Sequence, residues 1–277
     1  MKLWDYHTHC YLCNHAIGSI EDYVRSAIEY RISEIGISDH FPMELLPEHF
    51  HIYAMKLDAF PSYIDEIKRL RKKYSSQINI KVASEVDFFP KAFEEYKQIV
   101  SLFSDSLDFI IGSIHAVPWP GLGAIPIDEK QAIPIIKEIG VDKAYLEYYN
   151  SVLRMVQTKF FDIIGHLDLP KKYGLLPENN DGIWEKVLQI LDEVEKNGMA
   201  VEINTSGYRR QIYQPFPSEQ IILELIQRKV PLALGSDAHA PQDIGFKFQE
   251  IIKKLKKWGL TSLCQFSNQE ISLLPFD

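Results

Sequence analysis

Short runs of apolar and β-branched residues alternate along the chain with longer stretches whose apolar residues recur at helical spacing. Continuous apolar runs of this kind are typical of strands that are buried on both faces, as in parallel sheets. Seven such strands are predicted: Leu3–Tyr6, Ile35–Ser38, Ile78–Ser84, Phe109–Ser113, Phe161–Gly165, Ala200–Ile203 and Pro231–Gly235.

An amphipathic helix is predicted after each strand. The first begins at Ser19, a good N-cap residue with the acidic Asp22 in the first turn, and runs to about Arg31. Gly198 and Gly259 stand where C-terminal caps belong. The remaining helices are predicted over about Ala59–Tyr74, Lys91–Phe103, Lys143–Lys159, Ile183–Lys196, Ser218–Arg228 and Gln242–Trp258.

Repeated strand–helix units over most of the chain predict an α/β protein, either a barrel or a doubly wound open sheet. Periodicity alone does not separate these two architectures, and seven strands would make a barrel irregular. Composition is even from end to end, without a Gly/Ser linker or a sequence repeat. We therefore expect a single domain over residues 1–277.

Composition and charge narrow the functional classes. The 46% of hydrophobic and 25% of charged residues are those of an ordinary globular protein. A net charge of -8 gives no electrostatic reason to expect a nucleic acid or an anionic membrane as partner. We see neither a run of apolar residues long enough to span a membrane nor a signal-peptide pattern, and so predict a cytoplasmic protein.

The three cysteines are an odd number and too few for a disulfide scaffold. Cys10 and Cys13 form a single C-x-x-C, which we interpret as small residues of the loop after the first strand. A zinc or redox role is the alternative. Cys264 is predicted to be a packing residue.

Histidine and acidic residues gather at the carboxyl ends of six of the seven predicted strands. In parallel α/β folds the active site forms at that edge, so these side chains should converge. Taken singly, each has a structural explanation, such as a core histidine or a helix-capping aspartate. Taken together, they indicate a metal site. The candidate ligands are His7, His9, His15, His40, Glu85, His115, His166, Asp237 and His239.

The composition of this set bears on the metal and on its chemistry. Imidazoles crowded among carboxylates need cations, and such ligands suit Zn, Mn or Fe. Nine ligands exceed what one ion uses, whereas a carboxylate bridging two ions, with a third ion nearby, would use them all. Adjacent ions favour hydrolysis at phosphorus or at an acyl carbon. The sequence has no G-x-S-x-G and no Walker-type loop, so no protein nucleophile is expected.

These motifs, taken in order along nearly the whole chain, resemble the polymerase-and-histidinol-phosphatase (PHP) superfamily. The residues that carry the resemblance are His7-Thr8-His9, Ser38-Asp39-His40, Glu85, His115, Gly165-His166-Leu167-Asp168 and Ser236-Asp237-Ala238-His239. The resemblance implies a distorted (β/α)7 TIM-like barrel with a trinuclear site for divalent ions. It implies one ion held by His7, His9, Glu85 and Asp237, a second by Glu85, His115 and His166, and a third by His15, His40 and His239.

Within the superfamily, the chain resembles the monofunctional histidinol-phosphate phosphatases. The stretch Glu202-Ile203-Asn204-Thr205-Ser206-Gly207-Tyr208-Arg209 carries this resemblance, with support from Gly112-Ser113-Ile114-His115 and the segment from Tyr148-Tyr149 to Asp168. It implies hydrolysis of L-histidinol phosphate, a small phosphorylated metabolite, by a hydroxide that bridges the first two ions.

Further roles are predicted around the ligands. Arg209 is predicted to grip phosphate oxygens in a bidentate manner, the alternative being an exposed salt bridge. Asp5, Asp39 and Asp168 flank ligands and are predicted to orient imidazoles, the alternative being simple turn residues. The loops Phe41–Tyr53 and Val117–Gly123 are candidate substrate lids.

Two alternatives to this function remain open from the sequence. The same site would also suit another phosphorylated metabolite, a nucleotide or a nucleic-acid phosphodiester, although the acidic balance disfavours nucleic acid. A non-catalytic metal-bound interaction module is the alternative of a different class, and the complete ligand set disfavours it. Three divalent ions would add about six positive charges at the site, so an acidic chain can still present a cationic pocket to a small phosphate.

Overall fold

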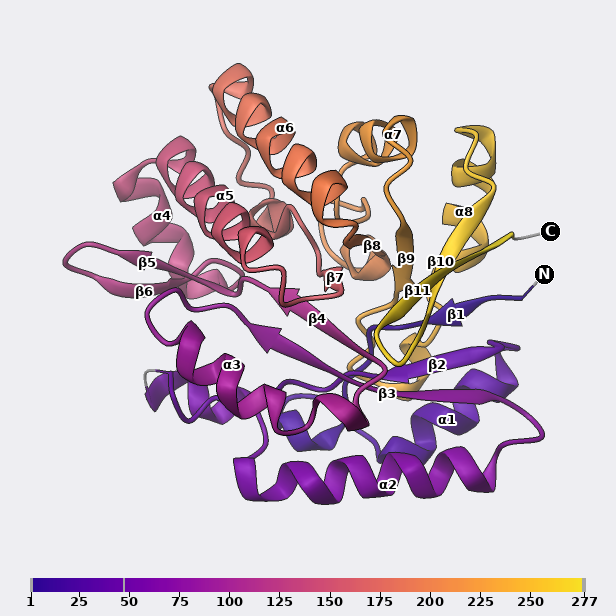
Figure 1. Ribbon diagram of the computed structural model, residues 1–277. Coiled ribbons are helices and arrows are strands. Elements are labelled where there is room, and N and C mark those ends of the chain that lie inside the picture. Colours follow the sequence, from indigo (N-terminus) through magenta and orange to yellow (C-terminus); the bar gives the residue numbers. More distant parts are fainter. Residues whose placement is uncertain (1, 47, 276–277) are drawn as a thin grey trace.

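Parallel strands form a barrel at the centre of the molecule (Figure 1). The computed structural model describes residues 2–46 and 48–275. Within this part of the chain, each barrel strand pairs in parallel with its neighbour in the order of the sequence. The strands are β1 (Trp4–Asp5), β2 (Glu34–Ile37), β3 (Asn79–Asp87), β4 (Phe109–Ser113), β7 (Ile163–Ile164), β8 (Ala200–Asn204) and β9 (Leu232–Gly235).

The sheet closes between its first and last strands. The Tyr6 amide donates to the Leu234 carbonyl at 3.0 Å, and the His9 amide donates to the Ala238 carbonyl at 2.9 Å. A parallel bridge between Thr8 and Ala238 continues this pairing beyond the two strands. These bonds decide between the two architectures that periodicity left open, and the predicted distorted barrel of seven parallel strands is confirmed.

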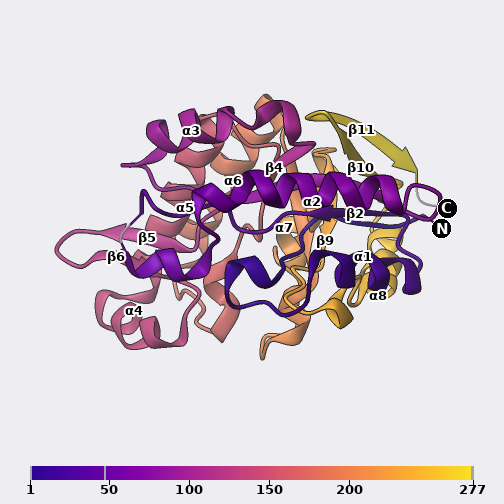
Figure 2. The same ribbon diagram turned by 90° about the horizontal axis from the view of Figure 1, so that it is seen from below.

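Helices surround the barrel, and α1 and α2 lie side by side against β2 and β3 (Figure 2). Ser19 caps α1 as predicted, since its Oγ accepts the Asp22 amide and the Asp22 carboxylate accepts the Ser19 amide. Gly198 ends α6 in the left-handed conformation, also as predicted. The helices are α1 (Ile20–Glu29), α2 (Phe60–Lys73), α3 (Phe93–Ser101), α4 (Ile133–Ile139), α5 (Val141–Gln157), α6 (Asn180–Asn197), α7 (Glu219–Gln227) and α8 (Phe248–Lys257).

Two antiparallel hairpins and the short helix α4 were not predicted. The expectation of a loop at Val117–Gly123 was wrong, because β5 (Ala116–Trp119) pairs with β6 (Gly123–Pro126). Two prolines and two glycines in that stretch obscure any strand pattern. The second hairpin joins β10 (Ser262–Ser267) to β11 (Glu270–Pro275).

The second hairpin seals the amino-terminal end of the barrel. Its Phe266 ring lies 5.7 Å from the Tyr6 ring and 5.2 Å from the Phe109 ring, measured between centroids. The indole nitrogen of Trp4 donates to the Cys264 carbonyl at 2.6 Å, and Cys264 is buried, as expected of a packing residue. This end is therefore filled by side chains, and the open end is the one where the strands finish. Among the described helices, none is long and apolar enough to cross a membrane.

Asp162 lies at the sealed end of the barrel, and its carboxyl makes the stability of the fold depend on pH. Asp162 accepts the Ile110 amide at 2.7 Å, and burial raises the pKa of Asp162 to about 7 in spite of that hydrogen bond. The unfolded chain keeps an aspartate pKa near 4. Between these values the folded protein binds a proton that the unfolded chain releases, so the stability that Asp162 contributes is lost as the pH rises.

We expect Asp162→Asn to be more stable than the wild type at pH 8, with a difference that shrinks toward pH 5, because the amide keeps an acceptor for Ile110 and does not ionise. Urea unfolding at both pH values measures this difference. Asp65→Asn, a change at an exposed carboxyl on α2, is the control. A difference between Asp162→Asn and wild type that is equal at both pH values would contradict the argument.

Candidate metal centre

All nine residues predicted to bind metal lie at the open mouth of the barrel. Five of them follow β1, β2 or β9, one lies within β3, two follow β4 and β7, and His15 comes from the loop after β1. A cavity of about 730 Å³ opens at this mouth. Eight of the nine line the cavity, and His7 is buried below it.

Glu85 lies at the centre of the group and is 1% exposed. Its two carboxylate oxygens face different imidazoles. The Oε2 atom lies 3.2 Å from His7 Nε2, 3.5 Å from His9 Nε2 and 3.1 Å from His40 Nδ1. The Oε1 atom lies 3.0 Å from His166 Nε2 and 3.7 Å from His115 Nε2. This is the arrangement of a carboxylate that can bridge two ions.

The remaining ligands extend the cluster toward solvent. Asp237 Oδ1 lies 3.3 Å from His9 Nε2, and the Nε2 atoms of His15 and His239 are 3.0 Å apart. Donor atoms come within 4.8 Å of one another in five groups of three. The groups are His7–His9–Glu85, Glu85–His115–His166, His15–His40–His239, His40–Asp87–His115 and His9–Cys13–His239. The first three of these groups correspond to the three ions that the family resemblance implies, without Asp237.

Hydrogen bonds at the outer nitrogens orient most of the imidazoles. In five of the seven histidines, Nδ1 contacts a carboxylate or a backbone carbonyl, and Nε2 is left to face the mouth. The contacts are His7 with Glu202 (2.8 Å), His9 with Asp39 (3.3 Å), His115 with Asp87 (2.8 Å), His15 with the Cys13 carbonyl (2.8 Å) and His239 with the Asp237 carbonyl (3.1 Å). Metal-binding histidines are typically fixed in this way.

Several of the inward-facing atoms are buried and have no hydrogen-bond partner. They include His7 Nε2, His9 Nε2, His40 Nδ1 and Glu85 Oε2. Each such atom costs about 1–3 kcal/mol when it is left unsatisfied. Because these atoms converge, divalent ions would satisfy them together. The residues present therefore fit a site for several transition-metal ions, with imidazole and carboxylate ligands suited to Zn, Mn or Fe.

Attraction between carboxylates and imidazoles shifts the pKa values of the groups in the cluster. Burial raises the pKa of Glu85 and Asp237, but the surrounding imidazoles outweigh burial and hold both carboxyls well below their usual range. Burial lowers the pKa of His7, but neighbouring carboxylates raise it well above its usual value. Burial and neighbouring imidazoles lower the pKa of His40 and His239. Without metal, the cluster thus holds ionised carboxylates beside both protonated and neutral imidazoles, and bound ions would take the place of the protons on the ligating nitrogens.

The three carboxylates predicted to orient imidazoles differ in their contacts. Asp39 lies beside the His9 ring, as given above. Asp5 accepts the amides of Ser236 and Gly245, each at 2.9 Å, and so braces the segment after β9. Asp168 pairs with Lys171 Nζ at 2.7 Å and accepts a backbone amide at 2.8 Å. For Asp5 and Asp168 these contacts are those of residues that hold loops rather than imidazoles.

Two carboxylates that do contact imidazoles were not predicted, Asp87 and Glu202. Glu202 Oε1 contacts His7, while its Oε2 accepts the His166 amide at 2.9 Å. Space for this carboxylate depends on Gly235, where a Cβ would lie 1.9 Å from Glu202 Oε1. Both residues could have been noticed from their positions in the sequence. Glu202 interrupts an apolar strand, and Asp87 lies two residues after Glu85, on the same face of β3.

Arg209 lies at the rim of the cavity, in a 3-10 turn over Thr205–Arg209. Its Nη2 donates to the carbonyls of Ser236 (2.9 Å) and Asp237 (2.8 Å), and its Nε lies 3.6 Å from an Asp243 oxygen. Nη1 is buried without a partner. The guanidinium is thus held rigidly by the segment that carries Asp237, with one nitrogen left for another acceptor.

A closed parallel barrel with imidazoles and carboxylates at its mouth defines the class of metal-dependent barrel enzymes. A model of the PHP domain matches residues 5–206, well over half of the chain. The chain belongs to the PHP domain family, in agreement with the resemblance of its motifs.

Relatives of similar sequence support the same assignment, and a solved structure shares the fold. The chain is 32% identical to the probable histidinol-phosphatase of Deinococcus radiodurans, over 93% of this chain and 94% of that protein. It is 27% identical to the histidinol-phosphatase of Bacillus subtilis, over 92% of this chain and all of that protein. The crystal structure of histidinol phosphate phosphatase from Lactococcus lactis, complexed with Zn, L-histidinol and phosphate, superimposes with a TM-score of 0.78. That structure is 22% identical, covers 98% of this chain and 99% of its own, and shows the shared fold.

Removal of the carboxylate behind His7 tests whether the outer hydrogen bonds prepare the cluster for metal. Glu202→Gln keeps the side-chain volume but replaces one of the two carboxylate oxygens by an amide nitrogen. The single remaining oxygen cannot accept from both the His7 ring and the His166 amide. We expect its affinity for zinc to fall by about 10–100-fold, the usual effect of losing such a partner. Titration of the metal-free protein with a competing zinc chelator measures the affinity. Glu185→Gln, on the exposed face of α6, is the control, and an unchanged zinc affinity in Glu202→Gln would contradict the orienting role.

Proposed function

We propose that this protein is a metal-dependent phosphomonoesterase that hydrolyses L-histidinol phosphate to L-histidinol and phosphate. The arrangement of Glu85 is the observation that carries the proposal, because its two oxygens divide the surrounding imidazoles into two groups. Membership of the PHP family and the two histidinol-phosphatase relatives, matched over nearly their whole length, support the choice of substrate.

The proposal includes three divalent ions and names their ligands. Glu85 would be shared between two positions, the first completed by His7, His9 and Asp237 and the second by His115 and His166. His15, His40 and His239 would hold the third ion. The unpartnered, buried nitrogen and oxygen atoms of these groups support the assignment. When bound, such ions lower the pKa of water toward neutrality and withdraw charge from phosphate oxygens.

The residues of the chain bind and orient the substrate around these ions. Arg209 would donate its free nitrogen to a phosphate oxygen while its other contacts keep the guanidinium in place. Phe50 and Tyr53, from the predicted lid Phe41–Tyr53, line the cavity and would shield the bound substrate from water. Residue 47 of that segment lies outside the described residues. A cavity of about 730 Å³ suits a small phosphorylated metabolite.

Two further parts of the proposal concern the chain as a whole. We propose that residues 1–277 act as one catalytic domain, although residues 1, 47 and 276–277 lie outside the described part. We also propose a cytoplasmic location. The three cysteines are free and buried, as expected in a reducing compartment.

Steady-state kinetics with metal content measured on the same sample test the proposed function. Histidinol phosphate is compared with sugar phosphates, nucleotides and a chromogenic phosphomonoester. We expect histidinol phosphate to have the highest kcat/KM by at least about tenfold, a difference of ~1.4 kcal/mol in transition-state binding. A higher kcat/KM for another phosphorylated compound would overturn histidinol phosphate as the proposed substrate. Bound metal without turnover of any phosphoester would favour a non-catalytic module.

Replacement of the central carboxylate is expected to abolish activity through loss of metal. Glu85→Ala removes the group shared by two ion positions and leaves its imidazole neighbours without the carboxylate that they share. We expect activity on histidinol phosphate to fall by at least about 10³-fold, equivalent to ~4 kcal/mol, and bound metal to fall with it. Glu94→Ala, which replaces an exposed carboxylate on α3, is the control and should keep both activity and bound metal. Retention of both activity and metal by Glu85→Ala would refute the mechanism.

Arg209 is expected to contribute to phosphate binding. A hydrogen bond from a charged donor contributes about 1.5–3 kcal/mol, so Arg209→Ala should lower kcat/KM by about 10–100-fold. Inhibition by inorganic phosphate should weaken in parallel, and thermal unfolding of the variant separates this effect from loss of the loop contacts. Arg210→Ala, at the next position on the rim, is expected to have a smaller effect. Equal kinetics for Arg209→Ala and wild type would reassign Arg209 to a structural role.

A further inference from the structure

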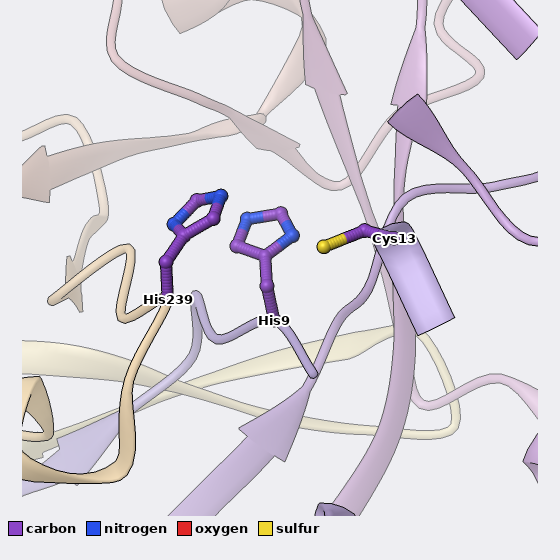
Figure 3. A group of neighbouring side chains, drawn as sticks. All are labelled: His9, Cys13 and His239. Carbon is purple, nitrogen blue, oxygen red and sulfur yellow. The ribbon is translucent and has the colours of Figure 1, made fainter. Parts of the chain in front are cut away.

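A buried cysteine lies against the metal cluster and has no place in the ligand sets given above. The Sγ atom of Cys13 comes within 4.8 Å of ring nitrogens of His9 and His239, and Cys13 is fully buried (Figure 3). The view shows the sulfur pointing toward the His9 ring and the His239 ring on the other side of His9. A sulfur and two imidazole nitrogens at such spacing are a donor set that soft divalent ions accept.

The turn that carries Cys13 also delivers a predicted ligand to the same place. Tyr11–Cys13 form a 3-10 turn, and Asn14 follows in the left-handed conformation with φ of 66°. The next residue is His15, whose Nδ1 contacts the Cys13 carbonyl at 2.8 Å and whose Nε2 lies 3.0 Å from His239 Nε2. One short turn therefore brings a sulfur and an imidazole nitrogen toward His239.

The other cysteine of the C-x-x-C is used differently. Cys10 Sγ lies 2.9 Å from Asp39 Oδ2, so its thiol is engaged by the carboxylate behind the His9 ring. Cys13 Sγ makes a weaker contact, 3.2 Å from the Cys10 carbonyl within its own turn. It also interacts with the side chains of His9 and His15. Only Cys13 of the two belongs to a group of converging donors among the described residues.

A second observation points to an ion at this place. The donor atoms of His15, His40 and His239 lie within 4.8 Å of one another and share His239 with the group that contains Cys13, and the His9 ring packs on the His40 and His239 rings, with centroids 4.4 and 4.2 Å away. The Nε2 atoms of His15 and His239 face one another at 3.0 Å, and a divalent ion would bind both nitrogens together. Zinc–sulfur and zinc–nitrogen bonds of about 2.3 and 2.0 Å place donors roughly 3.5 Å apart. A modest inward movement of Cys13 would reach this separation.

We propose that Cys13 is a further metal ligand, a thiolate donor to the third ion beside His15, His40 and His239, and that it makes this position selective for zinc over manganese. The inference rests on the metal centre of the proposed function. As the sulfur–metal bond forms, the thiol proton passes to solvent. Thiolate is a soft ligand that selects zinc or iron, whereas manganese prefers oxygen donors.

Cobalt substitution tests the proposal without measuring activity. The protein is stripped of metal and reloaded with Co²⁺, and its absorption spectrum and cobalt content are recorded. A cysteine thiolate bound to Co²⁺ gives an intense charge-transfer band in the near ultraviolet. We expect this band in wild type at full cobalt loading. We expect Cys13→Ser to lose the band and to bind its last cobalt equivalent about 10–100-fold more weakly, while the other cobalt equivalents stay bound.

The chain offers matched controls for this experiment. Cys10→Ser and Cys264→Ser should keep the band, because Cys10 contacts Asp39 and Cys264 lies at the sealed end of the barrel. The double variant Cys10→Ser/Cys264→Ser leaves Cys13 as the sole thiol and decides the question even where Cys13→Ser does not fold. Competition between Zn²⁺ and Mn²⁺ for the last site, in wild type and Cys13→Ser, measures selectivity.

Different failures have different consequences. Full loading with cobalt and no thiolate band, in wild type or in the double variant, overturns the role of Cys13 and leaves the metal centre intact. A band that persists in Cys13→Ser overturns the assignment to this residue. A wild-type protein that binds no cobalt, zinc or manganese overturns the metal centre itself, and the role of Cys13 with it.

Discussion

A single buried carboxylate, that of Glu85, is the interaction on which the mouth of the barrel depends. An isolated carboxylate at this depth would be protonated, because burial disfavours the ionised form. Imidazoles on both of its oxygens keep it charged, and Ser113 Oγ donates to Oε1 at 2.5 Å. The same residue also holds its neighbours by its backbone, since its amide donates to the Ser38 carbonyl and its carbonyl accepts the Phe41 amide. The position of His40 therefore follows from that of Glu85.

Closure of the barrel brings the ligands of the first and last strands together around Glu85. His7 and His9 come from the first strand and Asp237 and His239 from the last, and an open sheet would leave them at opposite edges. The bond from the His9 amide to the Ala238 carbonyl joins these edges at the level of the ligands. The aromatic contacts of Phe266 fill the opposite end. One end is thus rigid and apolar, and polar groups without partners gather at the other.

The sequence predicted the parts of this structure that follow from local pattern. Apolar runs marked the parallel strands because both of their faces are buried, and the histidines at strand ends marked the mouth because parallel strands finish together. The β5–β6 and β10–β11 hairpins escaped prediction because prolines, glycines and exposed polar residues mask their alternation. Glu202 and Asp87 escaped because their role depends on a contact with a histidine from another strand. Such contacts are decided by the register between strands, which no local pattern encodes.

The charge of the mouth explains how an acidic chain can attract a phosphate. Ionised Glu85 and Asp237 lie at its base, while the residues around the cavity include the cations Lys130, Lys172, Arg209 and Arg210 and the acidic Asp87, Asp128, Glu129 and Asp243. Lys172 is already paired with Asp128 at 2.9 Å and Arg209 lies near Asp243, so these cations alone leave little net positive charge. Three divalent ions would add about six charges at the base, where the local field is set by bound ions rather than by surface residues. Attraction for phosphate is therefore a property of the metal-loaded centre, and the side chains at the rim orient a ligand that the ions attract.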